Sequence, residues 1–148
     1  MADLKFSVDI AEPPNEVFAF FVPQRMPLWY GREMDARFHI LGASEFTAGQ
    51  KLRITGNLKG REMMLGVTIS AYEWGKLLEW QFEDSYGVRG TQRWELTPTV
   101  TGTHLLMGDS YRMPGLYGRI VDLVLTRFAV SLRDRSWLER LKHLAERR

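Results

Sequence analysis

The stretch Met63-Met-Leu-Gly-Val-Thr-Ile-Ser-Ala71 has an apolar side chain at every second position from its first residue to its last. Successive side chains of a β-strand point to opposite faces, so this period of two predicts a strand with one buried face. Neighbouring runs have the same period, and short segments rich in Gly, Asn, Asp and Pro separate them, which predicts an antiparallel meander of six strands. The inward positions of the other runs are Ala36, Phe38, Ile40, Leu52, Ile54, Leu78, Trp80, Phe82, Gln92, Trp94, Leu96, Leu105, Met107 and Tyr111.

The segment ahead of the meander predicts one more strand and two short helices. Alternation over residues 4–10 is typical of a half-buried strand, and two prolines follow it, which cannot donate to a strand ladder. The apolar residues 16–22 predict a short helix, and residues 24–30 predict one further turn.

The segment after the meander, residues 116–146, predicts one long C-terminal helix. Apolar residues recur every seven positions, at Leu116, Leu123, Val130, Trp137 and Leu144. A coiled coil is not predicted, because Arg127 and Asp134 occupy positions where the second apolar stripe of a heptad would lie. We expect instead a helix whose first half is enclosed by the curved sheet.

The composition restricts the classes of protein to consider. A length of 148 residues predicts a single domain over residues 1–148, and the lack of cysteine excludes disulfides, thiolate metal sites and a cysteine nucleophile. The sequence contains no recognisable signal peptide or membrane span, so we expect a cytoplasmic protein.

Residues 126–148 carry seven Lys/Arg against three Asp/Glu, which we interpret as a solvated helix face. We expect no nucleic-acid partner, because no aromatic platform accompanies these charges.

Three stretches carry a resemblance to a known family. They are Val8-Asp-Ile-Ala-Glu-Pro-Pro-Asn-Glu-Val-Phe18 followed by Trp29, then Trp94-Glu-Leu-Thr-Pro98 with Gly102-Thr103, and Tyr111-Arg-Met-Pro-Gly115 ahead of the long helix. In these the chain resembles the START-related or SRPBCC superfamily that includes the birch-pollen allergen, and its polyketide cyclase/dehydrase-like branch. The resemblance implies an α+β helix-grip fold, in which a seven-stranded curved antiparallel sheet wraps around a long C-terminal helix and two short helices join strands 1 and 2. It also implies an internal cavity, and members of the superfamily include lipid carriers, hormone receptors, cyclases and chaperone activators.

We expect the inward positions of the sheet to line this cavity. Most of them are apolar, which suits a hydrophobic small-molecule ligand that is lipid-like, aromatic or polyketide-like. A cavity filled with side chains, at less than about 300 Å³, the low end for ligand sites, would contradict this expectation. The predicted ligand-binding residues are Trp29, Phe38, Ile54, Leu65, Val67, Trp80, Phe82, Gln92, Trp94, Met107, Asp109, Tyr111 and Tyr117.

Asp109 is the most informative polar residue of this set. It shares the inward face of its strand with Met107 and Tyr111. A buried carboxylate has a partner, lies at a wet cavity or takes part in proton transfer, and Arg112 or Arg119 could be its partner. Asp109 and Tyr111 are therefore candidate catalytic residues.

Three classes of function remain open. The first is binding, transport or sensing of a hydrophobic small molecule. The second is a cofactor-independent, polyketide cyclase/dehydratase-like enzyme in which Asp109 with Tyr111 or Gln92 moves protons. The third is a protein-interaction module similar to chaperone activators, which would use the basic C-terminus or the exposed sheet; a homodimer also stays open.

The sequence predicts neither a metal site nor any other cofactor. His39, His104 and His143 lack the spacing of metal ligands, and no glycine-rich phosphate-binding motif is present.

Overall fold

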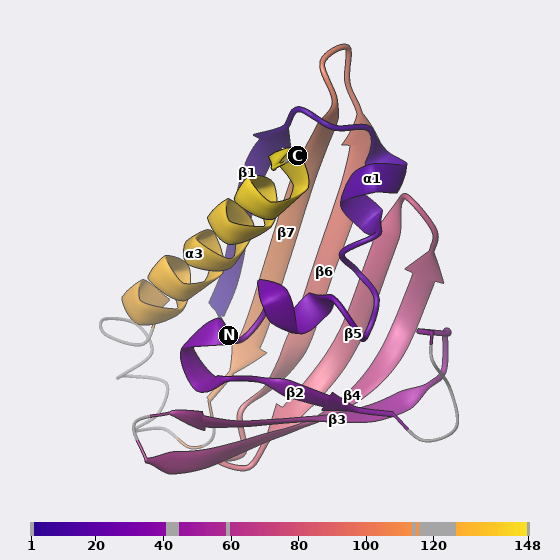
Figure 1. The fold of residues 1–148 in the computed structure, drawn as a ribbon. Coiled ribbons are helices and arrows are strands. Elements are labelled where there is room, and N and C mark those ends of the chain that lie inside the picture. The colour runs from indigo at the N-terminus through magenta and orange to yellow at the C-terminus, as the bar shows by residue number, and fades with distance from the viewer. Residues whose placement is uncertain (1, 41–44, 59, 114, 116–126, 148) are drawn as a thin grey trace.

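The computed structural model describes residues 2–40, 45–58, 60–113, 115 and 127–147. Its main element is one antiparallel sheet of seven strands in the order β1-β7-β6-β5-β4-β3-β2, strongly curved as Figure 1 shows. The predicted meander and the strand added to it are confirmed. The strands are β1 (Ala2–Ile10), β2 (Arg37–His39), β3 (Lys51–Leu58), β4 (Arg61–Glu73), β5 (Leu77–Asp84), β6 (Arg89–Pro98) and β7 (Thr103–Arg112).

Three short helical segments join β1 to β2. They are the α-helix α1 (Pro14–Phe18) and the 3-10 turns η1 (Met26–Leu28) and η2 (Arg32–Met34). The predicted short helix over residues 16–22 was wrong in its bounds. It starts earlier because Pro14 suits the first helical turn, and it ends at Phe18 because the Phe20 and Phe21 amides bond three residues back instead of four.

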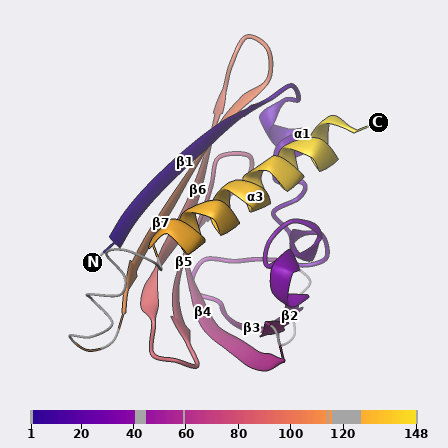
Figure 2. The same cartoon turned by 90° about the vertical axis from the view of Figure 1, so that its left-hand side faces the viewer.

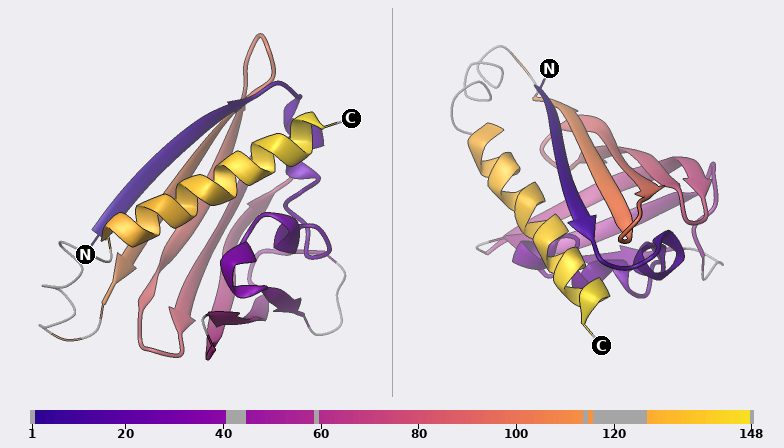
Figure 3. Two further views of the ribbon diagram at one scale, coloured as in Figure 1. Left: turned by 60° about the vertical axis from the view of Figure 1, so that its left-hand side comes forward. Right: turned by 90° about the horizontal axis from the view of Figure 1, so that it is seen from above.

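The helix α3 (Arg127–Glu146) crosses the concave side of the sheet and runs beside β1 (Figures 2 and 3). It buries Trp137, Leu138 and Leu141 against the rest of the protein. The predicted helix begins at residue 116, but residues 116–126, and with them the expected enclosure of its first half, lie outside the described residues. Within the described part, the sheet, the short helices and α3 confirm the predicted helix-grip class.

Two contacts fix the end of α3 to the end of β1. The Lys142 ammonium donates a hydrogen bond of 2.5 Å to the Asp9 carbonyl, and the Ala11 amide donates one of 2.7 Å to the Glu146 carboxylate. Charges of the basic C-terminus therefore serve the fold itself. No helix in the described part of the chain is long and apolar enough to span a membrane.

An aromatic cluster fills one half of the concave face. Trp80 and Trp94 of the sheet are fully buried beneath Phe21, Trp29 and Tyr30 from the segment between β1 and β2. Their rings meet mostly edge to face, with centroids of neighbouring rings between 5.0 and 6.1 Å apart. Such pairs stabilise a core by more than the burial of their apolar area alone. Aromatic side chains therefore fill this half of the concave face.

The close approach of β6 to β7 at Gly90 gives a test of the sheet register. A Cβ at Gly90 would lie 2.0 Å from the Ser110 carbonyl oxygen and 2.8 Å from the Tyr111 Cα, both of which are backbone atoms. Gly90→Ala is therefore expected to lower the free energy of unfolding in urea by about 1–3 kcal/mol. The control is Gly108→Ala in β7, where a Cβ meets nothing within 4 Å and a change within about 0.5 kcal/mol is expected. Equal effects of the two substitutions would contradict the register.

Candidate functional site

A cavity of about 190 Å³ lies between α3 and the half of the sheet that the aromatic cluster leaves free. Most of its lining side chains are apolar, and the polar ones come mainly from β6, β7 and α3. The described residues that line it are Tyr30, Glu33, Met34, Met63, Leu65, Phe82, Asp84, Val88, Gln92, Asp109, Tyr111, Met113, Val130, Arg133 and Trp137.

The predicted site residues separate into three groups. Leu65, Phe82, Gln92, Asp109 and Tyr111 line the cavity. Six others are buried in the core and do not line it; these are Trp29, Ile54, Val67, Trp80, Trp94 and Met107. Alternation along a strand gives the correct face, but the short helical segments cover part of that face. Phe38 lines a more open hollow beside β3, and Tyr117 lies outside the described residues.

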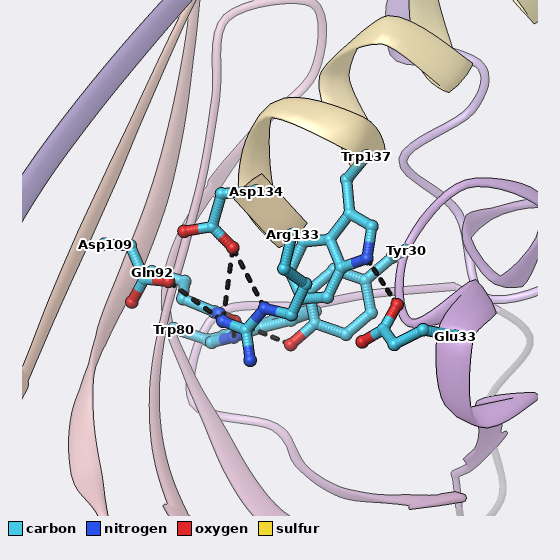
Figure 4. A network of polar contacts seen from close by, with 8 residues as sticks. All are labelled: Tyr30, Glu33, Trp80, Gln92, Asp109, Arg133, Asp134 and Trp137. Atoms are coloured by element: carbon cyan, nitrogen blue, oxygen red, sulfur yellow. Dashed lines mark hydrogen bonds and ion pairs between the residues drawn. The ribbon is translucent and has the colours of Figure 1, made fainter. Parts of the chain in front are cut away.

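The polar side of the cavity centres on Arg133 of α3, which lies between two carboxyl groups (Figure 4). Its Nη2 lies 3.2 Å from Asp109 Oδ2 on β7 and 3.1 Å from Asp134 Oδ1, and its Nε donates to the same Asp134 oxygen at 3.2 Å. Asp109 is 1% exposed and Asp134 is fully buried, whereas the Arg133 side chain is 35% exposed. One guanidinium thus connects the helix to the sheet.

Arg133 and Asp134 were missed as site residues by sequence reasoning. Arg112 was considered as a partner of Asp109, but its side chain is exposed, and Arg119 lies outside the described residues. The available signal was Asp134 itself, an acidic residue on the apolar stripe of a helix. Such a residue indicates a buried polar contact on the helix face that meets the sheet.

The environment of Asp134 favours its protonated form. Burial is the largest cause that raises its pKa, followed by a hydrogen bond with Asp109, and together they outweigh Arg133 and bring the pKa to about 9. Asp134 Oδ2 is buried and accepts no hydrogen bond within the described part of the chain. A proton on Asp134 makes this carboxyl a donor to Asp109.

Burial and the two aspartates act in opposite directions on Arg133. Burial lowers its pKa, but Asp134 and Asp109 outweigh burial and raise it, so the guanidinium stays charged. The guanidinium carbon also lies 4.5 Å from the centre of the Trp137 ring, a geometry in which the cation is attracted to the aromatic face.

A second group of hydrogen bonds surrounds Gln92 on β6. Its Oε1 accepts from the Tyr30 hydroxyl at 2.7 Å and from Trp80 Nε1 at 2.9 Å. Burial raises the pKa of Tyr30 well above its ordinary value, so its hydroxyl remains a donor. On the helix side, Trp137 Nε1 donates to Glu33 Oε2 at 2.8 Å, and its ring centre lies 4.3 Å from that of Tyr30.

The histidines lie away from this site. His39 contacts the Thr55 hydroxyl at 2.8 Å, and His104 contacts Asp9 at 2.8 Å, both on exposed surfaces. Among the residues that the structure describes, no three His, Asp or Glu side chains are grouped so that they could hold a metal ion.

Comparisons with known proteins agree on the fold. No model of a protein family matches the chain, and no curated protein sequence matches it. Among solved structures, protein MLL2253 from Mesorhizobium loti is 20% identical with a TM-score of 0.74, over 97% of this chain and 96% of that one. Ara h 8.0201 is 10% identical with a TM-score of 0.72, over 97% of both chains. DynU16, from the dynemicin biosynthetic locus, is 21% identical with a TM-score of 0.66, over 96% of this chain and 46% of that one. The chain is thus a helix-grip protein of the birch-pollen-allergen type in its fold, with a small cavity beneath α3.

The protonated state of Asp134 predicts how stability depends on pH. Between its ordinary value of 3.8 and about 9, the folded state holds one more proton on this group than the unfolded state. The contribution of Asp134 to stability is therefore complete below its ordinary pKa and is lost as pH rises toward 9, by up to about 1.4 kcal/mol per pH unit.

Asp134→Asn isolates this contribution, because an amide can donate to Asp109 without titrating. Urea unfolding at pH 5 to 8 is expected to show wild type losing stability relative to Asp134→Asn as pH rises. Parallel pH profiles of the two proteins would mean that Asp134 is ionised in the folded state.

Proposed function

We propose that the protein binds a small organic molecule, about one ring in size, in the cavity between α3 and the sheet. The observation that carries this proposal is a cavity with mainly apolar walls and a few polar groups gathered on one side. Ligand sites commonly have this composition, in which apolar walls supply affinity and polar groups fix orientation. Leu65, Phe82, Val88 and Val130 supply apolar wall, and Gln92, Asp109 and Arg133 form the polar side.

The volume restricts the size of the ligand. At about 190 Å³ the cavity is below the range of roughly 300–1,000 Å³ that is usual for ligand pockets, which counts against a lipid chain or a multi-ring polyketide. It is comparable with an engineered apolar cavity of about 150 Å³ that binds benzene. The cavity is thus smaller than the limit of about 300 Å³ that the expectation from the sequence required, so a lipid-like or polyketide-like ligand does not fit it and a compact ligand takes its place in the proposal.

A cyclase/dehydratase-like enzyme is the second candidate, because Asp109 lies on the cavity wall with a carboxylic acid and a guanidinium beside it. Binding is favoured over this alternative because Asp109 Oδ2 already accepts a hydrogen bond from Arg133. Asp109→Asn should abolish turnover of a 1,3-dicarbonyl compound if the alternative is correct. Unchanged turnover in this variant would eliminate the proposed acid/base role.

No contact among the described residues favours the protein-interaction module over these two candidates. Residues of its proposed basic surface, such as Lys142, bind other parts of the same chain. A cytoplasmic location and a homodimer remain predictions.

Fluorobenzene is a one-ring probe whose binding can be followed by ¹⁹F NMR. Wild type should bind it, and Val130→Trp should weaken binding at least tenfold, because the larger side chain would extend from α3 into the cavity. The matched control is Leu132→Trp, on the same helix at a position that is 56% exposed, which should bind as wild type does. Lack of binding by wild type, or equal binding by the two variants, would contradict the proposed site.

A further inference from the structure

The orientation of the Gln92 side chain leaves a hydrogen-bond donor for the cavity. The Trp80 indole can only donate, so the Gln92 atom that faces it must be the oxygen Oε1. The same oxygen accepts from Tyr30, and the amide nitrogen Nε2 has no hydrogen-bond partner among the described residues. Gln92 is 2% exposed and lines the cavity, so its free N–H groups are available to a molecule bound there.

Arg133 presents a second donor on the same side. Its Nε and Nη2 are used by Asp134 and Asp109, and Figure 4 shows Nη1 pointing away from both carboxyl groups. Nη1 makes no hydrogen bond to any residue that the structure describes. The two aspartates and the Trp137 ring hold the guanidinium in place before a ligand arrives, which reduces the ordering cost of binding.

The two donors belong to neighbouring positions of the site. Gln92 on β6 lies directly opposite Asp109 on β7 in the strand register, and Asp109 is the residue that binds Arg133. The polar side of the cavity therefore offers N–H groups from Gln92 and Arg133 close to the same point of the sheet.

The charged groups around the cavity restrict the charge that a bound ligand can carry. The charge of Arg133 is already balanced by Asp109, and Asp134 retains its proton at neutral pH. The cavity wall also includes two further acidic residues, Glu33 and Asp84. A ligand carboxylate would add to the excess of negative charge. An ammonium group has no acceptor for the N–H groups of Gln92 and Arg133, and the guanidinium would repel it at this point.

From this arrangement we infer that the ligand is a neutral one-ring carbonyl compound whose oxygen accepts hydrogen bonds from Arg133 Nη1 and Gln92 Nε2. The inference rests on the proposed binding function and specifies the chemical class of ligand. The ring would lie against the apolar wall that includes Leu65, Phe82 and Val88.

Four probes with the same number of non-hydrogen atoms test this inference by titration at pH 7. Acetophenone carries the carbonyl, and α-methylstyrene replaces its oxygen with a methylene group. Benzoate carries an anion, and 1-phenylethylamine carries a cation. Wild type is expected to bind acetophenone and α-methylstyrene, and to bind both charged probes at least tenfold more weakly than acetophenone.

A double variant, Arg133→Met with Asp109→Asn, removes the donor and its paired charge together, so no unpaired charge is left buried. It should raise the Kd of acetophenone about tenfold, the loss expected for one hydrogen bond from a charged donor, and leave that of α-methylstyrene within about twofold. The control is Arg93→Met with Glu79→Gln, which removes an ion pair of 2.7 Å on the outer face of the sheet and should change neither Kd. Binding of α-methylstyrene by the double variant also shows that it is folded.

The outcomes separate the inference from the function on which it rests. If both neutral probes bind but the double variant changes their Kd values equally, the carbonyl assignment is wrong and the binding function stands. If benzoate or 1-phenylethylamine binds more tightly than acetophenone, the ligand is charged and the neutral class is wrong. If wild type binds none of the four, the proposed binding function fails as well.

Discussion

The contact of Arg133 with Asp109 and Asp134 is the constraint on which the rest of the site depends. Removing charged groups from water is costly, and the cost is met here by hydrogen bonds from Arg133 to Asp134 on the same helix and to Asp109 on a strand of the sheet. Because the Asp134 carboxyl retains a proton, one guanidinium is sufficient for two acidic side chains. This contact joins α3 to the sheet, and it determines that Nη1 is the part of Arg133 left for a ligand.

The size of the cavity follows from how aromatic side chains occupy the concave face. Trp29 and Tyr30 pack on Trp80 and Trp94 and fill one half of that face, so a ligand has only the other half. Three methionines, Met34, Met63 and Met113, contribute to the remaining wall, and their flexible side chains can adapt to compact ligands of different shape. The many aromatic residues of the chain thus serve mainly as core, with the ligand site at their margin.

The sequence was sufficient for the sheet and for the inward direction of Asp109. A period of two leaves little freedom in which face a residue occupies, and Asp109 follows Leu105 and Met107 inward to a position that is 1% exposed. The partner of Asp109 could not be predicted, because Arg133 reaches it only once α3 is docked at a particular rotation. The volume could not be predicted either, because alternation does not show which inward side chains the short helical segments cover, and Trp94 and Leu65 look equivalent in the sequence.

A crystal structure of the protein with bound acetophenone tests the central claim most directly. The ligand is expected beneath α3, with its oxygen about 3 Å from Arg133 Nη1 and its ring against Leu65 and Phe82. Arg133 is expected to keep both aspartate contacts in the complex. A ligand whose oxygen points away from Arg133, or one that binds outside this cavity, would rule out the proposed carbonyl site.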